Sequence, residues 1–239
     1  MEKLFDVVFE DADLLVINKP AGLVCHPTKG DQYSSLISRT RLYASEQFTP
    51  YIVNRLDRET SGIVVVAKNA ATAGELGKKW EARAVRKEYL AIVHGDVIED
   101  HGVIHAPLGK DESSRVVVKD CVRPDGSPAQ TEWFVERRVK NELGSFSLLR
   151  VVPLSGRKHQ IRIHLQSIGH PIVGDKLYGG DEDCYLALVE NRLTEEQRRK
   201  LILPQQALHA EKVQFTFRGA EKSFSAEPEE WFVSFAAGG

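Results

Sequence analysis

A short polar segment in the first quarter of the chain contains residues that could carry out chemistry. Asp57 stands between Arg55 and Arg58, and Gly62 leads from this turn into the β-branched run 63–67. Neighbouring positive charge favours the ionised form of a carboxylate, and an ionised carboxylate can attack an electron-poor carbon. The same residue types also build an ordinary surface turn, and the turn by itself favours that simpler interpretation.

Two later segments combine glycines with polar residues. In the first, Gly156 precedes Arg157, His159 and Gln160, and such a density of donors can form an anion-binding helix N-terminus. The alternative is a glycine turn that leads into an amphipathic helix with a charged outer face. The second segment, 167–179, contains glycines and a proline, which indicate a tightly folded loop. It has neither the spacing of a phosphate loop nor that of a dinucleotide site.

Metal ligation and aromatic stacking are weakly supported by the residues themselves. His159, His164 and His170 suggest a metal site, but no carboxylate stands at ligand spacing and no HExxH pattern occurs. We therefore expect no bound metal. Tyr89 begins an apolar strand, and an isolated tyrosine on a strand is usually half-buried packing.

Length and composition fit a soluble globular protein. The 239 residues (26.8 kDa) suffice for one large domain or two small ones. No apolar run reaches the roughly 18 residues of a membrane span, and the acidic N-terminal residues argue against a signal peptide. Cys25, Cys121 and Cys184 are odd in number and widely spaced. This favours a reducing cytoplasm over a disulfide framework.

The charge is nearly balanced but unevenly distributed. A net charge of −2 argues mildly against a general nucleic-acid binder. Basic residues gather in the segments 78–87 and 157–162, and acidic residues gather in 181–183 and 227–230. For each cluster alone, a solvated surface is the simpler interpretation.

Hydrophobic periodicity predicts a mixed α+β fold. Helices are indicated at about 35–44 and 69–83, and from Thr194, where Thr194 and Gln197 form a capping-box pattern. The segment 157–168 fits either a helix or a strand. We expect a single, mainly antiparallel domain over residues 1–239. Its strands are predicted at 5–9, 14–17, 62–67, 89–93, 116–118, 131–139, 145–152, 208–217 and 222–225.

Several longer motifs follow one another in a fixed order. They are Val16–Pro27, Arg55–Gly62, Lys87–Tyr89, Gly156–Leu165, Gly169–Gly179 and Ala207–Ala210. Together, over roughly residues 6–230, they resemble the motifs of the RluA family of RNA pseudouridine synthases. Several long motifs in one order rarely arise by chance. The resemblance therefore outweighs the simple-turn interpretation of Asp57.

The resemblance implies a fold, a reaction and a partner. The pseudouridine synthase fold has a bent, mainly antiparallel central sheet, flanked by helices and loops and crossed by an RNA cleft. The reaction isomerises uridine in structured RNA to pseudouridine without a cofactor. The implied partner is a stem-loop of ribosomal or transfer RNA, and we expect a cytoplasmic monomer without membrane contact. Because the motifs begin by residue 16, the N-terminal S4 RNA-binding domain of many relatives is expected to be absent.

The resemblance also implies roles for individual residues. Asp57 is the catalytic carboxylate, and Tyr89 stacks on the target base and assists removal of its C5 proton. Arg162 pairs with the catalytic aspartate, which agrees with the need of a buried carboxylate for a partner. Arg55 enters the space that the extruded base leaves, where a guanidinium can stack and form hydrogen bonds. The remaining substrate-binding positions are Ile163 and Leu208 as pocket walls, and Arg157, His159 and Gln160.

The chain departs from the family pattern at three places. Asn54 stands where a histidine usually precedes the Arg-Leu-Asp motif, and Ser155 stands where a threonine usually precedes Gly156. The segment 181–204 is longer and more acidic than the resemblance leads us to expect. None of these departures removes a catalytic group, but the first bears on how the Asp57 turn is held.

Two other functions are compatible with parts of the sequence. One is a catalytically idle RNA-binding protein of the same fold, which the presence of Asp57, Tyr89 and Arg162 disfavours. The other is a hydrolase or phosphotransferase with an aspartate nucleophile. That function needs metal ligands or a phosphate loop, and the sequence contains neither pattern.

Overall fold

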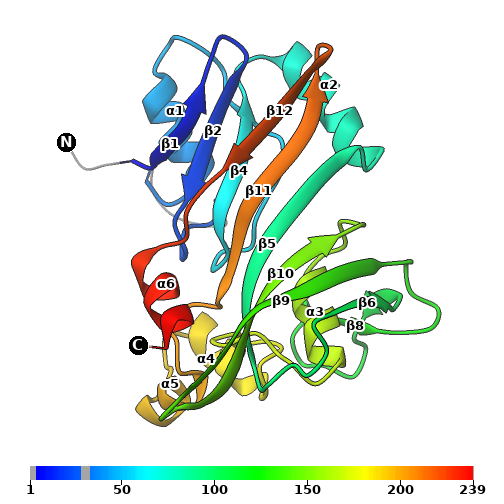
Figure 1. Ribbon diagram of the computed structural model, residues 1–239. Coiled ribbons are helices and arrows are strands. Elements are labelled where there is room, and N and C mark those ends of the chain that lie inside the picture. The colour runs from blue at the N-terminus through cyan, green and yellow to red at the C-terminus, as the bar shows by residue number, and fades with distance from the viewer. Residues whose placement is uncertain (1–3, 28–32, 239) are drawn as a thin grey trace. The chain divides into compact units, whose positions relative to one another are not determined.

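A computed structural model describes residues 4–27 and 33–238 (Figure 1). Their internal contacts divide them into two compact units. The first unit holds the residues up to Glu88 together with His209–Glu229, and the second holds Tyr89–Leu208 together with the residues from Glu230 onward. The strands β5 (Val85–His94) and β11 (Leu208–Phe217) each pass from one unit into the other.

In the first unit, β4 is a central strand of the sheet. It pairs antiparallel with β2 and β3 and parallel with β11, and every residue of β4 is buried. A strand covered on both faces carries apolar residues without alternation, which explains the continuous run predicted at 62–67. Besides β11, the strands of this unit are β1 (Asp6–Glu10), β2 (Leu14–Lys19), β3 (Tyr51–Ile52), β4 (Ser61–Ala67) and β12 (Ala220–Ser225).

Gly62 determines how closely β11 approaches β4. Its φ of +109° is a conformation that side chains rarely adopt. A Cβ at this position would lie 2.3 Å from the carbonyl oxygen of Ala210, which is its register partner on β11. Glycine is therefore required directly after the Asp57 turn, because any side chain would push the two strands apart.

The helices of the first unit begin at polar capping residues. Asn69 caps α2 (Ala70–Glu81), as the sequence predicts, since its Oδ1 accepts a hydrogen bond from the Thr72 amide at 2.9 Å. Leu76 of α2 is buried in the hydrophobic cluster of this unit, and Trp80 packs against the same cluster. The predicted helix at 35–44 is α1 (Leu36–Ala44), whose cap is Ser35.

The second unit contains an antiparallel sheet and a separate two-stranded hairpin. In the sheet, β10 pairs with β5 and β9, and β9 pairs with β6. The hairpin consists of β7 and β8. The strand bounds are β6 (His101–His105), β7 (Leu108–Lys110), β8 (Asp120–Val122), β9 (Gln130–Asn141) and β10 (Gly144–Pro153). The helices are α3 (Gln160–Ser167), α4 (Asp183–Val189), α5 (Glu195–Leu201) and α6 (Glu230–Ala237).

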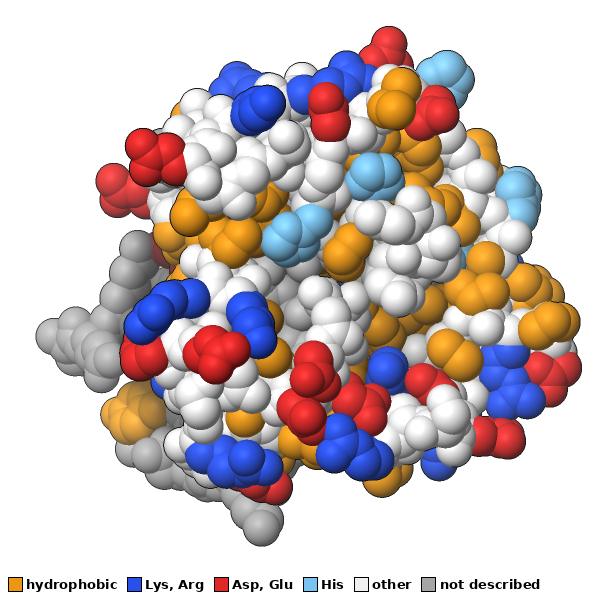
Figure 2. Space-filling view, turned by 90° about the horizontal axis from the view of Figure 1, so that it is seen from below, with side chains coloured by type: hydrophobic (Ala, Val, Ile, Leu, Met, Phe, Trp, Pro, Cys, Tyr) orange, Lys and Arg blue, Asp and Glu red, His pale blue; other side chains and the backbone are white. Residues whose placement is uncertain are grey.

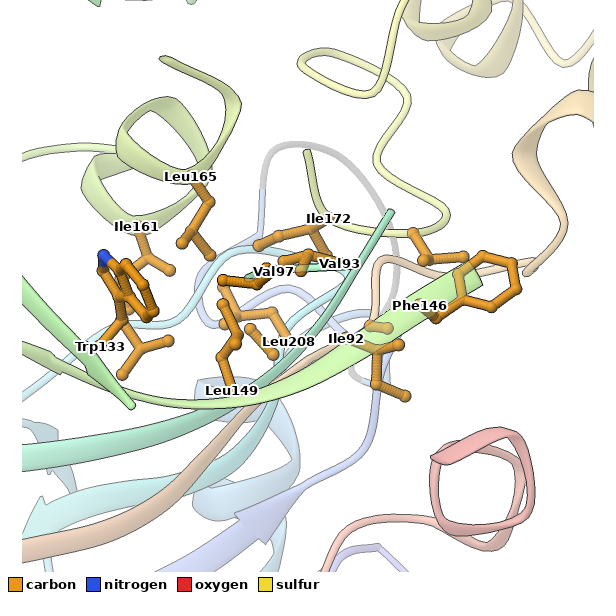
Figure 3. Packing of buried hydrophobic residues seen from close by; sticks show 14 of the residues in the cluster. Ile92, Val93, Val97, Trp133, Phe146, Leu149, Ile161, Leu165, Ile172 and Leu208 are labelled. Atoms are coloured by element: carbon orange, nitrogen blue, oxygen red, sulfur yellow. The ribbon is translucent and has the colours of Figure 1, made fainter. Parts of the chain in front are cut away.

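Helix α3 packs its apolar side chains onto the sheet of the second unit (Figure 3). Ile161 and Leu165 point from the helix toward Trp133 and Leu149 on the strands. The i, i+4 spacing of the two helix residues places them on one face. This contact fixes the orientation of α3, which carries several of the predicted site residues on its other positions.

The sequence prediction of a mainly antiparallel α+β fold is confirmed, and most elements lie where periodicity placed them. The segment 157–168, which fitted either a helix or a strand, forms α3. The capping box of Thr194 and Gln197 is present at the start of α5. The strand predicted at 116–118 is wrong, because these residues form a turn between β7 and β8 in which Val117 is exposed. Helices α4 and α6 were not predicted.

Charged side chains of both signs lie interspersed on the face shown in Figure 2. Acidic and basic groups are neighbours there rather than segregated, which agrees with the many ion pairs of the second unit. Among the helices of residues 4–27 and 33–238, none is long and apolar enough to cross a membrane.

Candidate active site

The Asp57 turn lies in the first unit, immediately before β4, and hydrogen bonds to its backbone hold it on both sides of the aspartate. The Leu56 amide donates to the Cys25 sulfur at 3.4 Å, and the Cys25 thiol lies 3.5 Å from the Leu56 carbonyl oxygen. The Gly22 amide donates to the Arg58 carbonyl at 2.9 Å. The segment 22–25 therefore supports the residues before and after Asp57, and the Asp57 side chain itself is half-buried.

A fully buried lysine stabilises the same turn. The Lys19 side chain has no exposed surface. Its ammonium group donates to the carbonyl oxygens of Leu23 (2.8 Å), Pro20 (2.9 Å) and Arg58 (3.2 Å). Burial lowers the pKa of this lysine to about 8, so most of the group is still protonated at neutral pH. Lys19 thereby ties the end of β2 to the residue that follows Asp57.

We expect Lys19→Met to lower the free energy of unfolding by about 2–3 kcal/mol at pH 7, because three carbonyls lose their donor and buried unpaired groups cost about 1–3 kcal/mol. Lys222→Met, which removes a partly exposed lysine 3.7 Å from Asp11 in the same unit, should change it by less than about 1 kcal/mol. Urea unfolding of both variants tests this. Equal losses would show that the three carbonyls do not depend on Lys19.

The residues around Asp57 have distinct surroundings. Arg55 and Arg58 are both exposed, and the Arg58 Nε donates to the Gly22 carbonyl at 3.2 Å. Asn54, which stands at the usual histidine position, accepts from the Val65 amide at 2.8 Å and donates to the Ile63 carbonyl at 3.1 Å. Asn54 thus binds the segment before the turn to the middle of β4, so the departure from the family pattern leaves the turn anchored.

In the second unit, Arg162 forms a buried ion pair with Asp175. The Arg162 Nε and Nη2 donate to the two carboxylate oxygens at 2.7 and 2.9 Å. The same carboxylate also accepts from the amides of Leu177 and Tyr178, at 2.9 and 3.0 Å. Burial opposes ionisation of Asp175, but the Arg162 charge and the four hydrogen bonds outweigh it and lower the pKa of the carboxyl group.

Tyr178 connects this pair to its surroundings. The Arg162 guanidinium lies 4.9 Å from the centre of the Tyr178 ring, a cation–π distance. The Tyr178 hydroxyl lies 2.9 Å from His159 Nδ1 and accepts from the Asp120 amide at 3.2 Å. Burial raises the pKa of Tyr178, so its hydroxyl stays protonated. Arg162 is therefore fixed by a carboxylate on one side and an aromatic ring on another.

Gln160 holds the N-terminus of α3 through contacts inside the protein. Its side-chain carbonyl accepts from the Ser155 hydroxyl at 2.8 Å and from the Arg157 amide at 3.0 Å. Its amide group donates to the Gln130 carbonyl and the Thr131 hydroxyl, at 2.8 and 2.9 Å. Gln160 is buried, so these contacts give it a positioning role, and its predicted contact with substrate stays a prediction. Ser155, at the usual threonine position, supplies the hydroxyl that this arrangement needs.

The other predicted pocket residues lie in well-packed surroundings. Ile163 is buried in a cluster with Leu177 and Tyr178, and Leu208 is buried in the main cluster of the second unit (Figure 3). Tyr89 is half-buried and packs against that main cluster. The wall roles of Ile163 and Leu208 stay predictions.

The histidines that suggested a metal are engaged in separate contacts. His164 Nδ1 lies 2.7 Å from the Thr131 hydroxyl, and its Nε2 lies 2.9 Å from the Ala106 carbonyl oxygen. His170 Nδ1 lies 2.9 Å from the His94 carbonyl oxygen. His159, as described, contacts Tyr178. Each ring thus binds protein groups of its own, and the three do not converge on one point.

The structure brings the site residues together within each unit. Arg157, His159, Gln160, Arg162 and Ile163 all lie on α3 or on the turn before it, and Arg157 is exposed. Asp57 and Arg55 share the turn of the first unit. Since Asp57 belongs to the first unit and Tyr89 and Arg162 belong to the second, the pairings between them stay predictions.

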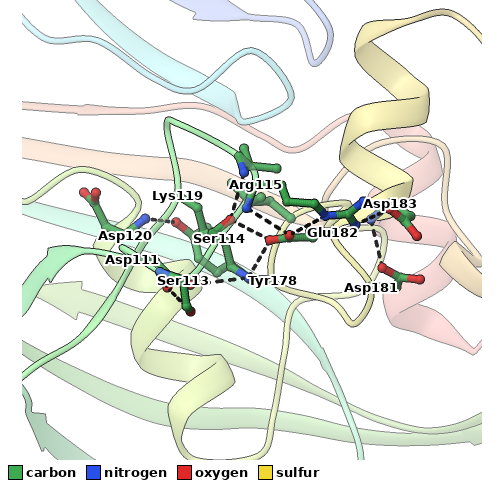
Figure 4. Close-up of polar contacts among 12 residues, drawn as sticks. Asp111, Ser113, Ser114, Arg115, Lys119, Asp120, Tyr178, Asp181, Glu182 and Asp183 are labelled. Atoms are coloured by element: carbon green, nitrogen blue, oxygen red, sulfur yellow. Dashed lines mark hydrogen bonds and ion pairs between the residues drawn. The ribbon is translucent and has the colours of Figure 1, made fainter.

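The acidic segment 181–183 binds the turn between β7 and β8 (Figure 4). The Ser114 hydroxyl, the Arg115 amide and the Lys119 ammonium donate to Glu182 at 2.6, 3.2 and 3.2 Å. Arg115 also pairs with Asp183. The hydrogen bond from Ser114, helped by Lys119, lowers the pKa of Glu182 from its ordinary 4.5 to about 2. This part of the acidic segment therefore neutralises basic side chains of the protein itself.

We expect Glu182→Gln to reduce stability at pH 7 and to have a smaller effect near pH 2. A carboxyl whose pKa is lowered by folding contributes stability above its unfolded pKa and loses it as pH falls through the folded pKa, here between 4.5 and about 2. Urea unfolding across this range measures the difference from the unsubstituted protein. Glu142→Gln, at an exposed glutamate of the β9–β10 turn, is the control. A difference that does not change with pH would contradict the Ser114–Glu182 bond.

Comparison with known proteins shows the fold to which this chain belongs. The family model described as RNA pseudouridylate synthase matches residues 13–167, a range that contains Asp57, Tyr89 and Arg162. Two solved structures share the fold, the human RNA pseudouridylate synthase domain containing 1 (TM-score 0.75) and 4 (TM-score 0.71). Each is 24% identical and covers 95% of this chain, which in turn covers 86% and 90% of theirs. The fold is therefore that of the RNA pseudouridine synthases.

Comparison with curated relatives shows which family of RNA pseudouridine synthases the chain belongs to. The dual-specificity RNA pseudouridine synthase RluA of Vibrio parahaemolyticus is 39% identical over 74% of this chain and 70% of its own. The ribosomal large subunit pseudouridine synthase D of Nitrosomonas europaea is 37% identical over 88% of this chain, which spans only 57% of that relative. The chain belongs to the RluA family of RNA pseudouridine synthases, as its motifs predicted.

Sequence reasoning missed Lys19 and Asp175 as structural residues of the site. Both stand inside the matched motifs, but neither was given a role. The available signal was a charged residue close to apolar ones: Lys19 ends the strand that begins at Leu14, and Asp175 follows Ile172 and Val173. A charged side chain in such a position is buried only when hydrogen-bonding or charged partners are buried with it.

Proposed function

We propose that this chain uses Asp57 to isomerise uridine to pseudouridine in structured RNA. In this reaction the bond between N1 of the base and C1′ of the ribose breaks, the uracil rotates, and C5 joins C1′. The C5 hydrogen leaves as a proton, and N1 gains one. One observation best supports Asp57 as the catalytic group: Lys19 and the segment 22–25 hold its turn from two sides. Such anchoring suits a group that must be held accurately against a ribose or base.

The remaining groups complete the proposed mechanism. Arg162, oriented by Asp175, supplies the counter-charge that keeps Asp57 ionised. Tyr89 stacks on the extruded base and assists removal of the C5 proton. Arg55 is exposed and fills the space left by that base, where its planar guanidinium can stack and donate hydrogen bonds. No cofactor takes part in these steps.

The substrate is a stem-loop of ribosomal or transfer RNA. Extruding a base costs least where the nucleotide is already unpaired, and RNA is read mainly in loops and bulges. The names of the two bacterial relatives, dual-specificity and ribosomal large subunit, support this range of substrates. We infer that the protein acts in the cytoplasm, which agrees with its widely spaced cysteines, and that it acts as a monomer.

The test uses transcribed ribosomal and transfer RNAs that carry tritium at C5 of uridine. Each isomerisation replaces the C5–hydrogen bond, so the wild-type protein should release tritium to water and leave pseudouridine in the digest. An idle RNA-binding protein would bind the same RNAs and release none. That outcome would favour the alternative function over the proposed one.

A further inference from the structure

A cluster of basic side chains lies where α2 ends and β5 begins, in the first unit. It consists of Lys78, Lys79, Arg83, Arg86 and Lys87, which we call the α2–β5 basic cluster. Lys78, Arg83 and Arg86 are exposed, and Lys79 and Lys87 are half-buried. The sequence alone allowed an ordinary solvated face here, but two members of the cluster are not explained by that interpretation.

Arg83 lies two residues before β5, and Lys87 is the third residue of that strand. Within the described part of the chain, neither has a carboxylate oxygen within 4.0 Å. Burial, and then the Arg83 charge, lower the pKa of Lys87. Like charges held together are unfavourable unless an anion joins them.

The backbone conformation at Arg83 also sets this residue apart. Its φ of +58° is left-handed, and it directly follows the C-cap residue of α2, where glycine is the usual choice. An arginine at this position adds strain that glycine would avoid. Lys78 and Lys79 need no such explanation, because cations in the last helical turn complement the helix dipole. Arg86 is paired with Glu88 at 2.7 Å.

Several basic side chains of the second unit are neutralised by acids of the protein itself. On the β7–β8 hairpin and the turn between its strands, Arg115, Lys119 and Arg123 are all paired with acids. On α5, Arg198 pairs with Glu195 and Lys200 with Glu196. No carboxylate among the described residues neutralises Arg83 or Lys87 in this way, so these two cations can bind an external anion.

We propose that Arg83 and Lys87, flanked by Lys78 and Lys79, bind phosphates of the RNA backbone. The inference rests on the proposed function, because an enzyme that modifies RNA must hold a polyanion as well as the target base. Phosphate contacts position a nucleic acid without reading its sequence. The α2–β5 basic cluster therefore contributes affinity to every RNA substrate and takes no part in the reaction at the base.

The test is the salt dependence of RNA binding by the double variant Arg83→Gly and Lys87→Met. Glycine suits the left-handed backbone at 83, and methionine keeps an apolar stem at 87, so both changes favour a folded protein. The matched control, Arg198→Gln with Lys200→Met, removes two cations from α5 that are paired with glutamates. The probe is one transcribed transfer RNA, and its dissociation constant is measured by fluorescence anisotropy from 0.05 to 0.3 M salt.

Each lost phosphate contact should make the slope of log K against log salt shallower by about 1. The double variant should therefore lose about 2 from the slope, and bind roughly 20- to 60-fold more weakly at 0.1 M salt. Its rate of pseudouridine formation at saturating RNA should match the wild type. An unchanged slope, or an equal change in the control, would overturn the proposal. Failure of the wild type to form pseudouridine is a separate result, which would overturn the proposed function and not the phosphate site.

Discussion

Asp175→Ala is expected to lower the free energy of unfolding by about 3–5 kcal/mol, the usual cost of leaving one member of a buried ion pair without its partner. The Arg162 guanidinium would keep its charge and lose both carboxylate contacts. The amides of Leu177 and Tyr178 would lose their acceptor as well. For a chain of this length, such a loss corresponds to a fall in Tm of roughly 6–20 °C.

Exposed and buried versions of the same contact can be compared within the second unit. Asp125 also binds an arginine through both oxygens, Arg123 at 2.8 and 2.7 Å, but its side chain is 69% exposed. Asp125→Ala should therefore cost less than about 1 kcal/mol. Urea unfolding of both variants measures the difference. Equal costs would contradict the claim that burial makes the Arg162–Asp175 pair important.

A second variant separates the buried charge from the lost hydrogen bonds. In Arg162→Met with Asp175→Asn, both charges are gone, and the asparagine oxygen can still accept from the amides of Leu177 and Tyr178. We expect this double variant to be more stable than Asp175→Ala, because replacing a whole buried pair is often nearly neutral. If it were less stable, the unpaired guanidinium would not be the cause of the loss.

The elements predicted correctly are those whose pattern is local. The β-branched run that follows Gly62 identified β4, and an asparagine cap with i, i+4 apolar spacing identified α2. Helix α6 was missed because Phe232 and Phe235 make it helical by packing into the main cluster of the second unit. Valines at 116–118 resemble a strand, but two of them are exposed in a turn that Glu182 holds from outside.

The candidate site also divides into residues that local motifs predict and residues that only distant contacts reveal. Motifs in order predicted catalytic roles for Asp57, Tyr89 and Arg162 without any knowledge of distance, and these roles stay predictions. The supports of these residues could not be identified in this way, because they join distant positions. Lys19 binds a carbonyl 39 residues away, and Arg162 binds a carboxylate 13 residues away. Gln160 was assigned to substrate from its motif, whereas its described partners are all within the protein.

Asp57→Asn is expected to reduce pseudouridine formation by about 10³-fold or more. Asparagine has nearly the same shape, so the turn held by Lys19 and Cys25 should persist. It cannot serve as an anion or a nucleophile, and losing a catalytic group of this kind costs about 10²–10⁴ in rate. RNA binding should stay within about threefold, because phosphate contacts supply most of the affinity. Asp96→Asn, at an exposed side chain of the second unit, is the control and should keep the wild-type rate.

The most direct measurement compares wild-type, Asp57→Asn and Asp96→Asn proteins on one RNA that carries tritium at C5 of uridine. Tritium released to water and pseudouridine in the digest are counted together, and RNA binding is measured in parallel. We predict release and product with the wild type and Asp96→Asn, and neither with Asp57→Asn, at similar RNA affinity. Release by Asp57→Asn at the wild-type rate would contradict the central claim that this carboxylate carries out the isomerisation.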